Sequence, residues 1–430
     1  MLTRFLLRLS ALGLKLVLTI VIARTLGFDS VAAYGLAIAT SVIASKALGL
    51  GFGPELNRRL SEANPLPAIA HARTVSVGYA MLYLLLAAAF AIATRNNAVV
   101  ALFDRFALSI PLAWCVLLVT LSEHAALEVN GWLFSLHRPR AGSILLFVRA
   151  GTWSGLASAA LLTGAMHSIE AVFVLWIATN LIVVAVAWHR INIFEQRASS
   201  VGLPESAAHP SRISAIWLHG LPFYLAGVIL SSLQYAERFI ASRSLSADVL
   251  GQYVFAWSIA SAAQAITFAV VVVTAAPRLI RTLADAPDTF LRRTTHAVTA
   301  NIAITLLASA IIFVAHPALF ALTNEPIAEK NVTLLALLLV SFILRAATDV
   351  LWVAAVALRA GGVVLATIAA LTLLYIPAAR YLIGNSGAVG MALAHLAASF
   401  AIAAALALIV MRRGGVWHVK HPTEIASHAG

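Results

Sequence analysis

Long apolar stretches separated by short polar segments dominate the chain. A membrane-spanning helix needs about 20 mostly apolar residues in succession. Applied along the whole sequence, this rule predicts an all-α integral membrane protein with twelve transmembrane helices. The expected spans are residues 5–23, 31–52, 75–94, 107–134, 142–164, 170–188, 213–236, 249–276, 297–315, 332–357, 361–383 and 387–411.

The composition supports a membrane protein and argues against a soluble one. Hydrophobic residues make up 61% of the 430 residues and charged residues only 11%, whereas a soluble domain carries roughly 25% charged residues. The net charge of +12 would suggest a nucleic-acid partner in a soluble protein. Here it is better explained by Lys and Arg gathered on the cytoplasmic side of a membrane, so no nucleic-acid partner is expected.

The polar segments between the spans predict the orientation and the domains. Lys and Arg gather in alternate segments, such as those with Arg58, Arg138 and Arg190, which places both termini in the cytoplasm. The longest loop contains Pro204 and Pro210 and is interpreted as a linker. The expected division is an N-terminal lobe at 1–190, a cytoplasmic linker at 191–212, a C-terminal lobe at 213–411 and a cytoplasmic tail at 412–430.

Three sequence blocks recur in the same order about half a chain later. In the first, Arg24, Leu26, Asp29, Tyr34 and Ala37 align with Arg243, Leu245, Asp248, Tyr253 and Ala256; in the second, Pro54 and Arg58 align with Pro277 and Arg281; in the third, Ala125, Glu128 and Arg138 align with Ala346, Asp349 and Arg359. Blocks at a nearly constant offset indicate an internal duplication. Because each half holds an even number of spans, the halves form a parallel repeat of two pseudo-symmetric six-helix lobes, and such repeats place the substrate between them.

Charged residues inside the predicted spans are the candidate functional residues. The basic ones are Lys15, Lys46, Arg149, Arg345 and Arg380. A charge at a helix centre costs about 2.5–3.5 kcal/mol, so it usually faces the protein interior or a water-filled path. For Lys46 and Arg380, which lie nearer helix ends, the alternative is that the side chain snorkels to the interface.

Fewer acidic residues fall inside the spans. They are Glu123 and Glu128 in the fourth span and Asp349 in the tenth. Asp349 and Arg345 are four residues apart, as are Glu128 and His124, so each could form a local pair on one helix face. The functional alternative is a protonation switch or cation site. Because the basic residues outnumber the acidic ones, the transport path is expected to suit an anion, and Arg matches phosphate with two-pronged geometry.

Four motifs resemble one transporter family. They are Ala-Arg-Thr-Leu-Gly with a later Tyr at 23–34, the segment 49–59, Gly-Leu-Pro-Phe at 220–223 and the Glu-Arg-containing segment 237–253. They resemble the polysaccharide (O-antigen type) flippases of the multidrug/oligosaccharidyl-lipid/polysaccharide exporter (MOP) superfamily over essentially the whole chain. Two positions depart from the family pattern: Glu237 stands where Asp is common, and Phe28-Asp29-Ser30 replaces the usual Pro-x-x-Phe-Gly run.

The resemblance implies a function. The protein would flip undecaprenyl-pyrophosphate-linked oligosaccharide from the inner to the outer leaflet of the bacterial inner membrane by alternating access, for surface or exopolysaccharide synthesis. The basic residues named above would line a cationic lumen. Polysaccharide polymerase and chain-length machinery would be partners beside the lipid bilayer, without any cofactor or metal.

Two alternatives remain open. A drug or organic-cation exporter of the same superfamily would be expected to have acid-lined lobes. A membrane-embedded polysaccharide polymerase or ligase, which would be an enzyme, would be expected to carry a large outer loop with catalytic Arg and His. The outer loops are short and the halves are duplicated, so a transporter is favoured over an enzyme.

Overall fold

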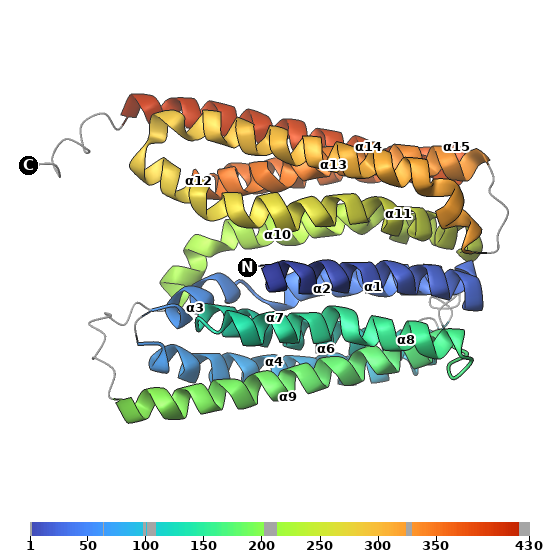
Figure 1. Ribbon diagram of the computed structural model, residues 1–430, viewed down its shortest axis with the longest axis horizontal. Coiled ribbons are helices and arrows are strands. Elements are labelled where there is room, and N and C mark those ends of the chain that lie inside the picture. Colours follow the sequence, from blue (N-terminus) through green and yellow to red (C-terminus); the bar gives the residue numbers. More distant parts are fainter. Residues whose placement is uncertain are drawn as a thin grey trace, which may run out of the picture. The chain divides into compact units, whose positions relative to one another are not determined.

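The computed structural model describes residues 2–62, 64–97, 100, 109–201, 213–323 and 329–420. The described elements are all helical (Figure 1). In chain order they are α1 (Leu2–Leu26), α2 (Phe28–Leu48), α3 (Gly53–Leu60), α4 (Leu66–Ala93), α6 (Ile110–Ser135), α7 (Pro139–Phe147), the π-helix η1 (Val148–Thr152), α8 (Trp153–Leu162), α9 (Ile169–Val201), α10 (Ile213–Ala241), α11 (Ala247–Thr267), the π-helix η2 (Phe268–Val272), α12 (Val273–Asp285), the short η3 (Pro287–Thr289), α13 (Phe290–Ala321), α14 (Glu329–Ala357) and α15 (Gly361–Lys420).

Every predicted span coincides with a helical segment, although residues 107–108 of the fourth lie outside the described residues. In the described part of the chain, ten helices are long and apolar enough to cross a membrane. Several helices, such as α4, α9 and α13, extend beyond their predicted spans, because an apolar window detects only the part of a helix that lies in lipid. The exact number of crossings and the side on which each terminus lies stay predictions.

The surface of these helices is that of a membrane protein. Large apolar side chains such as Leu84, Val314 and Leu373 are 71%, 80% and 74% exposed. In water such broad apolar exposure would be unfavourable, at roughly 25 cal/mol for each Å² of apolar surface. Lipid as the surrounding solvent removes this cost, so the chain is a multi-pass membrane protein.

The chain divides into two compact units. Met1–Tyr224 together with Leu245–Gly251 form the first, called here the N-terminal lobe, and Leu225–Ser244 together with Gln252–Gly430 form the second, the C-terminal lobe. The predicted linker at 191–212 is helical up to Val201, and residues 202–212 lie outside the described residues. The predicted domain boundaries stay a prediction.

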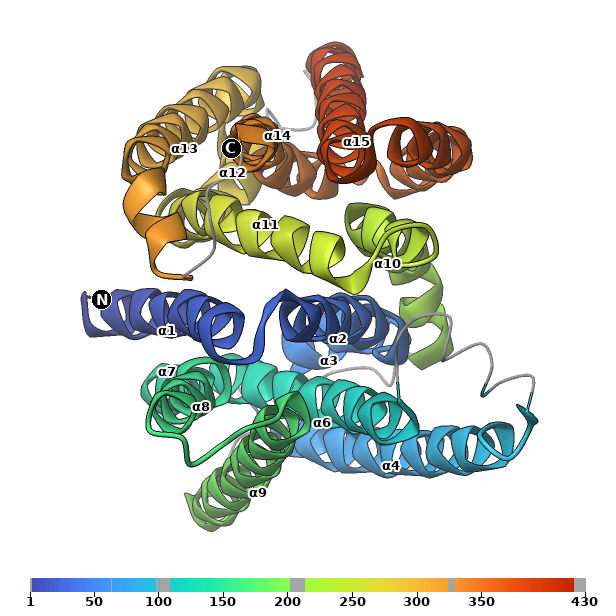
Figure 2. The ribbon, with the colours of Figure 1, turned by 90° about the vertical axis from the view of Figure 1, so that its right-hand side faces the viewer.

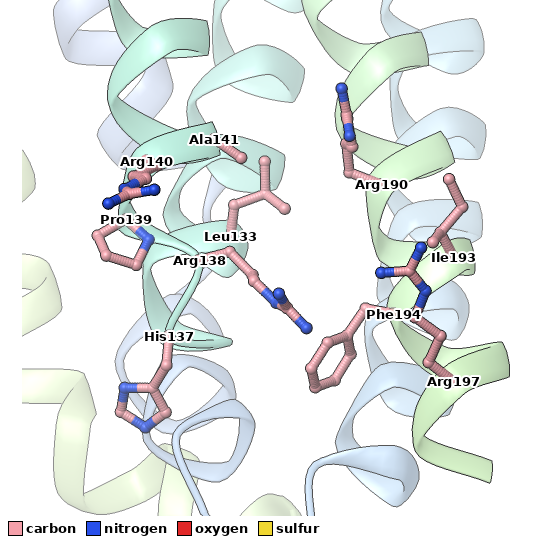
Figure 3. Close-up of a pocket in the computed structure, with 10 residues that line it drawn as sticks. All are labelled: Leu133, His137, Arg138, Pro139, Arg140, Ala141, Arg190, Ile193, Phe194 and Arg197. Carbon is pink, nitrogen blue, oxygen red and sulfur yellow. The ribbon is translucent and has the colours of Figure 1, made fainter. Parts of the chain in front are cut away.

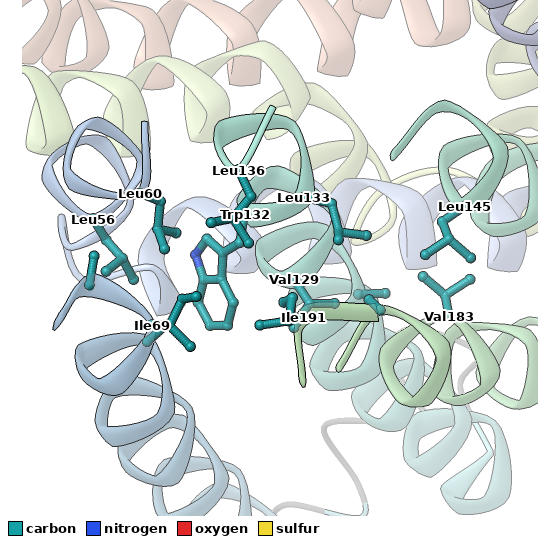
Figure 4. Packing of buried hydrophobic residues seen from close by; sticks show 14 residues of the cluster. Leu56, Leu60, Ile69, Val129, Trp132, Leu133, Leu136, Leu145, Val183 and Ile191 are labelled. Atoms are coloured by element: carbon teal, nitrogen blue, oxygen red, sulfur yellow. The ribbon is translucent and has the colours of Figure 1, made fainter. Parts of the chain in front are cut away.

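In the N-terminal lobe, α6 packs against α9 and α2, and α1 packs against α7, η1 and α8. Figure 4 shows how apolar side chains from α3, α4, α6, α7 and α9 meet at one end of this lobe. Trp132 lies in this cluster, is 1% exposed, and contacts Trp188 edge-on with ring centroids 5.6 Å apart. This cluster fixes the ends of α6 and α9 relative to the turn that begins α7.

In the C-terminal lobe, α14 packs against α15, α13 and α12 (Figure 2). Helix α15 is broken at Gly387, where φ is 55° and ψ is −129°. A Cβ atom at Gly390 would lie 2.0 Å from the carbonyl oxygen of Leu382, so the chain after the break lies directly against the chain before it. The break falls between the eleventh and twelfth predicted spans. Glycine is needed at Gly387 for the backbone conformation and at Gly390 for the close approach.

The repeated Asp-and-Tyr block has the same local structure in both copies. It begins α2 in the first copy and α11 in the second, with Asp29 and Asp248 in the first helical turn. An acidic side chain there is favourable because the helix N-terminus is the positive end of the helix dipole. Tyr34 and Tyr253 are both buried, 1% and 0% exposed. The second copy therefore repeats the first in local structure as well as in sequence.

Candidate functional site

A buried ion pair lies at the centre of the N-terminal lobe. Glu123 on α6 accepts a hydrogen bond from the Arg149 guanidinium through one carboxylate oxygen. Its other oxygen accepts a hydrogen bond of 3.0 Å from the indole nitrogen of Trp176 on α9. Both charged side chains are only 12% exposed. A charge-assisted pair of this kind is how a carboxylate can be kept in an apolar interior.

The local backbone brings Arg149 to this position. Arg149 lies on the π-helix η1, an irregularity that often marks a functional site in an otherwise regular helix. A Cβ atom at Gly151 would lie 3.0 Å from the Cα of Ala11, so η1 packs closely on α1. The sequence places Arg149 inside a span but does not predict Glu123 as its partner, because the two lie on different helices.

Lys15 on α1 lies beside this ion pair and contacts the indole rings of Trp153 and Trp176. Its ammonium nitrogen lies 5.7 Å from the ring centroid of Trp176 and 6.0 Å from that of Trp153. The two indole rings stack with centroids 4.5 Å apart and an interplanar angle of 7°. Cations are attracted to the faces of such rings. Lys15, Arg149 and Glu123 thus form one cluster within this lobe, because Trp176 contacts both the Glu123 carboxylate and the Lys15 ammonium group.

His124 and Glu128 lie further along α6, among tyrosines of α4. The Tyr83 hydroxyl is 2.5 Å from Nδ1 of His124, and the Tyr79 ring meets the imidazole edge-on at 4.8 Å. Nε2 of His124 lies 4.0 Å from a Glu128 carboxylate oxygen, at the outer limit of an ion pair. The predicted local pair is therefore present only as a loose contact, and the carboxylate of Glu128 faces Gly49 and Gly53.

In the C-terminal lobe, Arg345 is held by a histidine. Its Nη1 lies 3.3 Å from Nε2 of His395, and the indole nitrogen of Trp257 lies 3.4 Å from the same atom. Two donors at Nε2 leave the ring proton on Nδ1, which lies 2.6 Å from the Ser341 hydroxyl. Ser341 in turn contacts Ser399 at 2.8 Å. His395 is thus a fully engaged polar residue that links α11, α14 and α15.

Asp349 corrects one prediction of the sequence analysis. The expected pair between Asp349 and Arg345 does not form among the described residues, because each finds a partner on a neighbouring helix. Asp349 accepts a hydrogen bond of 2.7 Å from the Gln264 side chain on α11, while Arg345 contacts His395. A spacing of four residues allows a pair but does not select it when closer tertiary partners exist.

Glu237 and Arg238 were missed as interior residues. The sequence placed them at the end of a span, but they are 0% and 1% exposed. The Tyr253 hydroxyl donates to Glu237 at 3.0 Å, and the Arg238 guanidinium lies 4.2 Å from the Trp257 ring centroid. The internal repeat is the signal that could have found them. Tyr253, which contacts Glu237, is the second copy of Tyr34, and both tyrosines are buried.

Two of the predicted basic residues are exposed. Lys46 lies in the last turn of α2, and Arg380 lies on α15; both side chains are on the surface of the chain. Exposure is compatible with both alternatives, a side chain that snorkels to the interface and one that lines an accessible path, so the role of both residues stays a prediction.

The charged candidates named from the sequence, taken together with Glu237 and Arg238, divide into an exposed set and a buried or half-buried set. Within that group, the buried or half-buried basic residues are Lys15, Arg149, Arg238 and Arg345, and the acidic ones are Glu123, Glu128, Glu237 and Asp349. Basic and acidic side chains are equal in number, and each lobe holds two of each. Among the described residues, no group of three or more His, Cys, Asp or Glu side chains could hold a metal ion.

Comparison with solved structures identifies the fold. No protein-family model and no curated protein matches the sequence. An inward-facing multidrug resistance MATE family transporter of the MOP superfamily matches with a TM-score of 0.67 and 15% identity, over 97% of this chain and 99% of that chain. The chain has the MATE fold. A Vibrio cholerae MATE transporter also matches, with a TM-score of 0.56 and 18% identity over 95% of this chain and 94% of that chain.

A third neighbour limits what the MATE fold implies. A MOP superfamily transporter from Pyrococcus furiosus has a TM-score of 0.60 and 15% identity, over 97% of this chain and 96% of that chain. Its description states that the reversed polarity of its binding pocket suggests a different function. The MATE fold and the exposed apolar helices make the chain a multi-pass membrane protein, consistent with the inner membrane of bacteria. The fold does not distinguish a flippase from a drug exporter.

Proposed function

We propose that this chain is a secondary transporter that exports drugs or organic cations by alternating access between its two lobes. The observation that carries the proposal is the position of Glu128 and Asp349. They are equivalent in the internal repeat, one on α6 and one on α14. Neither has a Lys or Arg nitrogen within 4.0 Å in the described part of the chain.

These two carboxylates differ from the rest of the interior charges. Glu123 is neutralised by Arg149, whereas Glu128 and Asp349 are held by His124 and Gln264. Lys46 and Arg345 act on them only from a greater distance. A carboxylate in this setting can bind a proton or an organic cation, but not both together. Such exclusive binding couples cation export to proton entry, and one carboxylate in each lobe lets both lobes take part.

The basic residues support this choice by their partners. Arg149 contacts Glu123 and Arg345 contacts His395, each through Nη1, so one arm of each guanidinium already has a partner within its own lobe. The multidrug transporters among the structural neighbours favour the same substrate class. A polymerase or ligase is disfavoured because these neighbours are transporters.

The test is efflux of a cationic dye from cells that lack their major exporters. We expect cells expressing this chain to retain several-fold less ethidium than cells expressing the Glu128→Gln and Asp349→Asn double variant. Equal retention in both, with equal amounts of protein in the membrane, would contradict the proposal. Dissipating the proton gradient should raise retention only in cells with the unmodified chain.

The second candidate is the lipid-linked oligosaccharide flippase. The four sequence motifs favour it, as does Lys15, whose ammonium contacts aromatic faces and not a carboxylate. Mass spectrometry of lipid extracts decides between the two. Accumulation of undecaprenyl-pyrophosphate oligosaccharide in a deletion strain, relieved by complementation, would establish the flippase. Unchanged lipid-linked sugars together with dye efflux would establish the exporter.

A further inference from the structure

A pocket of about 390 Å³ opens at one end of the N-terminal lobe, away from the charged clusters described above (Figure 3). It lies between the turn that joins α6 to α7 and the last turns of α9. Its floor is apolar, with Leu133, Ile193 and Phe194, and arginine side chains stand around it. These are Arg138, Arg140, Arg190 and Arg197.

Two of the arginines reach into the pocket. Figure 3 shows Arg138 and Arg197 extending from opposite walls toward the space beside Phe194. The Arg138 guanidinium lies 5.0 Å from the Phe194 ring centroid, which holds the side chain in place through a cation–π contact. A neighbouring pocket shares Arg138, Phe194 and Arg197 and extends toward the end of α3, where Glu62 lines it.

The positive charge of the pocket is uncompensated. In the described part of the chain, no carboxylate oxygen lies within 4.0 Å of any of its four guanidinium groups. The nearby acidic residues are engaged elsewhere: Glu195 pairs with Arg73, and Glu62 pairs with Arg58. Like charges gathered in one concave surface repel each other, so an anion between them would relieve the repulsion.

The backbone adds to this preference. The pocket is lined by Pro139, Arg140 and Ala141, which form the first turn of α7. The amide groups at a helix N-terminus lack partners within the helix and favour anions. His137 has a positive φ of 54°, and its Nε2 atom lies 3.2 Å from the Ser61 carbonyl oxygen. This contact fixes the turn that precedes the amide groups of α7.

The position of the pocket identifies the source of the anion. Candidate membrane spans end at Ser135 and at Ser200 and begin at Pro139, so the pocket lies at the ends of three candidate spans. We propose that this pocket binds the phosphate group of an anionic phospholipid headgroup, with the apolar floor in contact with the first part of its tail. Basic pockets between spanning helices at this depth suit such headgroups. The site does not depend on which cargo the protein carries.

The test uses the purified full chain in nanodiscs of phosphatidylcholine, with cardiolipin added in increasing proportion. Native mass spectrometry then counts the lipid that the protein retains. We expect the Arg138→Gln and Arg197→Gln double variant to bind cardiolipin about 25-fold more weakly, at about fivefold for each arginine removed. The matched control is Arg278→Gln with Arg281→Gln, which removes the same charge from exposed positions of α12.

Two further measurements make the result decisive. The Arg138→Lys and Arg197→Lys variant keeps the charges and should keep most of the binding, which separates charge loss from misfolding. Inorganic pyrophosphate is the soluble probe: if it binds in pure phosphatidylcholine nanodiscs and the pocket variant abolishes this, the ligand is a free phosphate and the lipid proposal is wrong. Equal cardiolipin binding by the pocket variant and the control would also overturn it.

Discussion

In the N-terminal lobe the carboxylate of Glu123 is held by the guanidinium of Arg149, whereas in the C-terminal lobe Glu237 is held by the hydroxyl of Tyr253. The arginines differ in the same way, because Arg345 contacts the neutral ring of His395. The first lobe thus holds Glu123 and Arg149 by direct pairing, whereas the second holds Glu237 and Arg345 by hydrogen bonds with neutral groups.

This difference predicts how each lobe responds to substitution. Removing one member of a buried ion pair leaves an uncompensated charge, which is more costly than losing one hydrogen bond to a neutral group. The N-terminal lobe should therefore be most sensitive to single changes at its Glu123–Arg149 pair, and it should be rescued by removing both members of that pair. The C-terminal lobe should lose stability in smaller steps.

The largest expected effect is at the Glu123–Arg149 pair. Glu123→Gln leaves the buried Arg149 guanidinium unpaired and should lower the free energy of unfolding by about 3–5 kcal/mol. Thermal unfolding followed by tryptophan fluorescence in detergent measures this. The control is the Glu123→Gln and Arg149→Met double variant, which should recover most of the loss. A double variant as unstable as the single one would contradict the pairing account.

A smaller effect is expected at His395. His395→Phe removes the acceptor for Arg345 and Trp257, and the loss of hydrogen bonds from one charged and one neutral donor should cost about 2–3 kcal/mol. The same unfolding assay measures it. If His395→Phe proved more destabilising than Glu123→Gln, the contrast between the lobes would be wrong.

At Lys15 the expected change in stability is smaller again. Lys15→Met keeps the length of the side chain and removes a charge that is held by aromatic faces, so stability should change by no more than about 1 kcal/mol. The same substitution sharpens the choice of substrate, because a flippase that holds a pyrophosphate at Lys15 would lose transport. Dye efflux that survives Lys15→Met would favour the exporter.

The smallest effect is at Glu55 on α3, outside the membrane-spanning segments. Hydrogen bonds from Arg58 and Arg59 lower the pKa of Glu55 below its ordinary value of 4.5. A lowered folded-state pKa means that the stabilisation is present above about pH 4.5 and is lost as the pH falls through the folded-state value. Because Arg58 is 60% exposed, the loss should be under about 1 kcal/mol. Unfolding measured between pH 7 and pH 3 should show this step, and Glu55→Gln should remove it.

The sequence predicted the helices better than it predicted their contacts. Apolar length is a local property, so each span from 5–23 to 387–411 could be found by reading along the chain. The partners of Glu123 and Arg345 could not be found in this way, because Arg149 and His395 lie on other helices at no fixed spacing. Glu237 was placed at a span end because charge itself was used to end the span.

The charge balance shows the same limit. Counting charges inside the spans gave an excess of basic residues and pointed to an anionic cargo. The structure exposes Lys46 and Arg380 and buries Glu237 with Arg238, so burial at these four positions does not follow from their place in the predicted spans. A residue near a helix end can face lipid, the headgroup region or the interior, and only packing decides among these.

The most direct test of the proposed function is transport in proteoliposomes. Purified protein is reconstituted with an imposed proton gradient, and uptake of a cationic dye is followed with the unmodified chain and with Glu128→Gln and Asp349→Asn singly and together. We predict gradient-driven dye transport that falls with each substitution and is abolished by both, while thermal unfolding stays close to that of the unmodified chain. Undiminished transport by the stable double variant would contradict the assignment of these carboxylates, and an absence of dye transport by the unmodified chain would contradict the cation-exporter proposal itself.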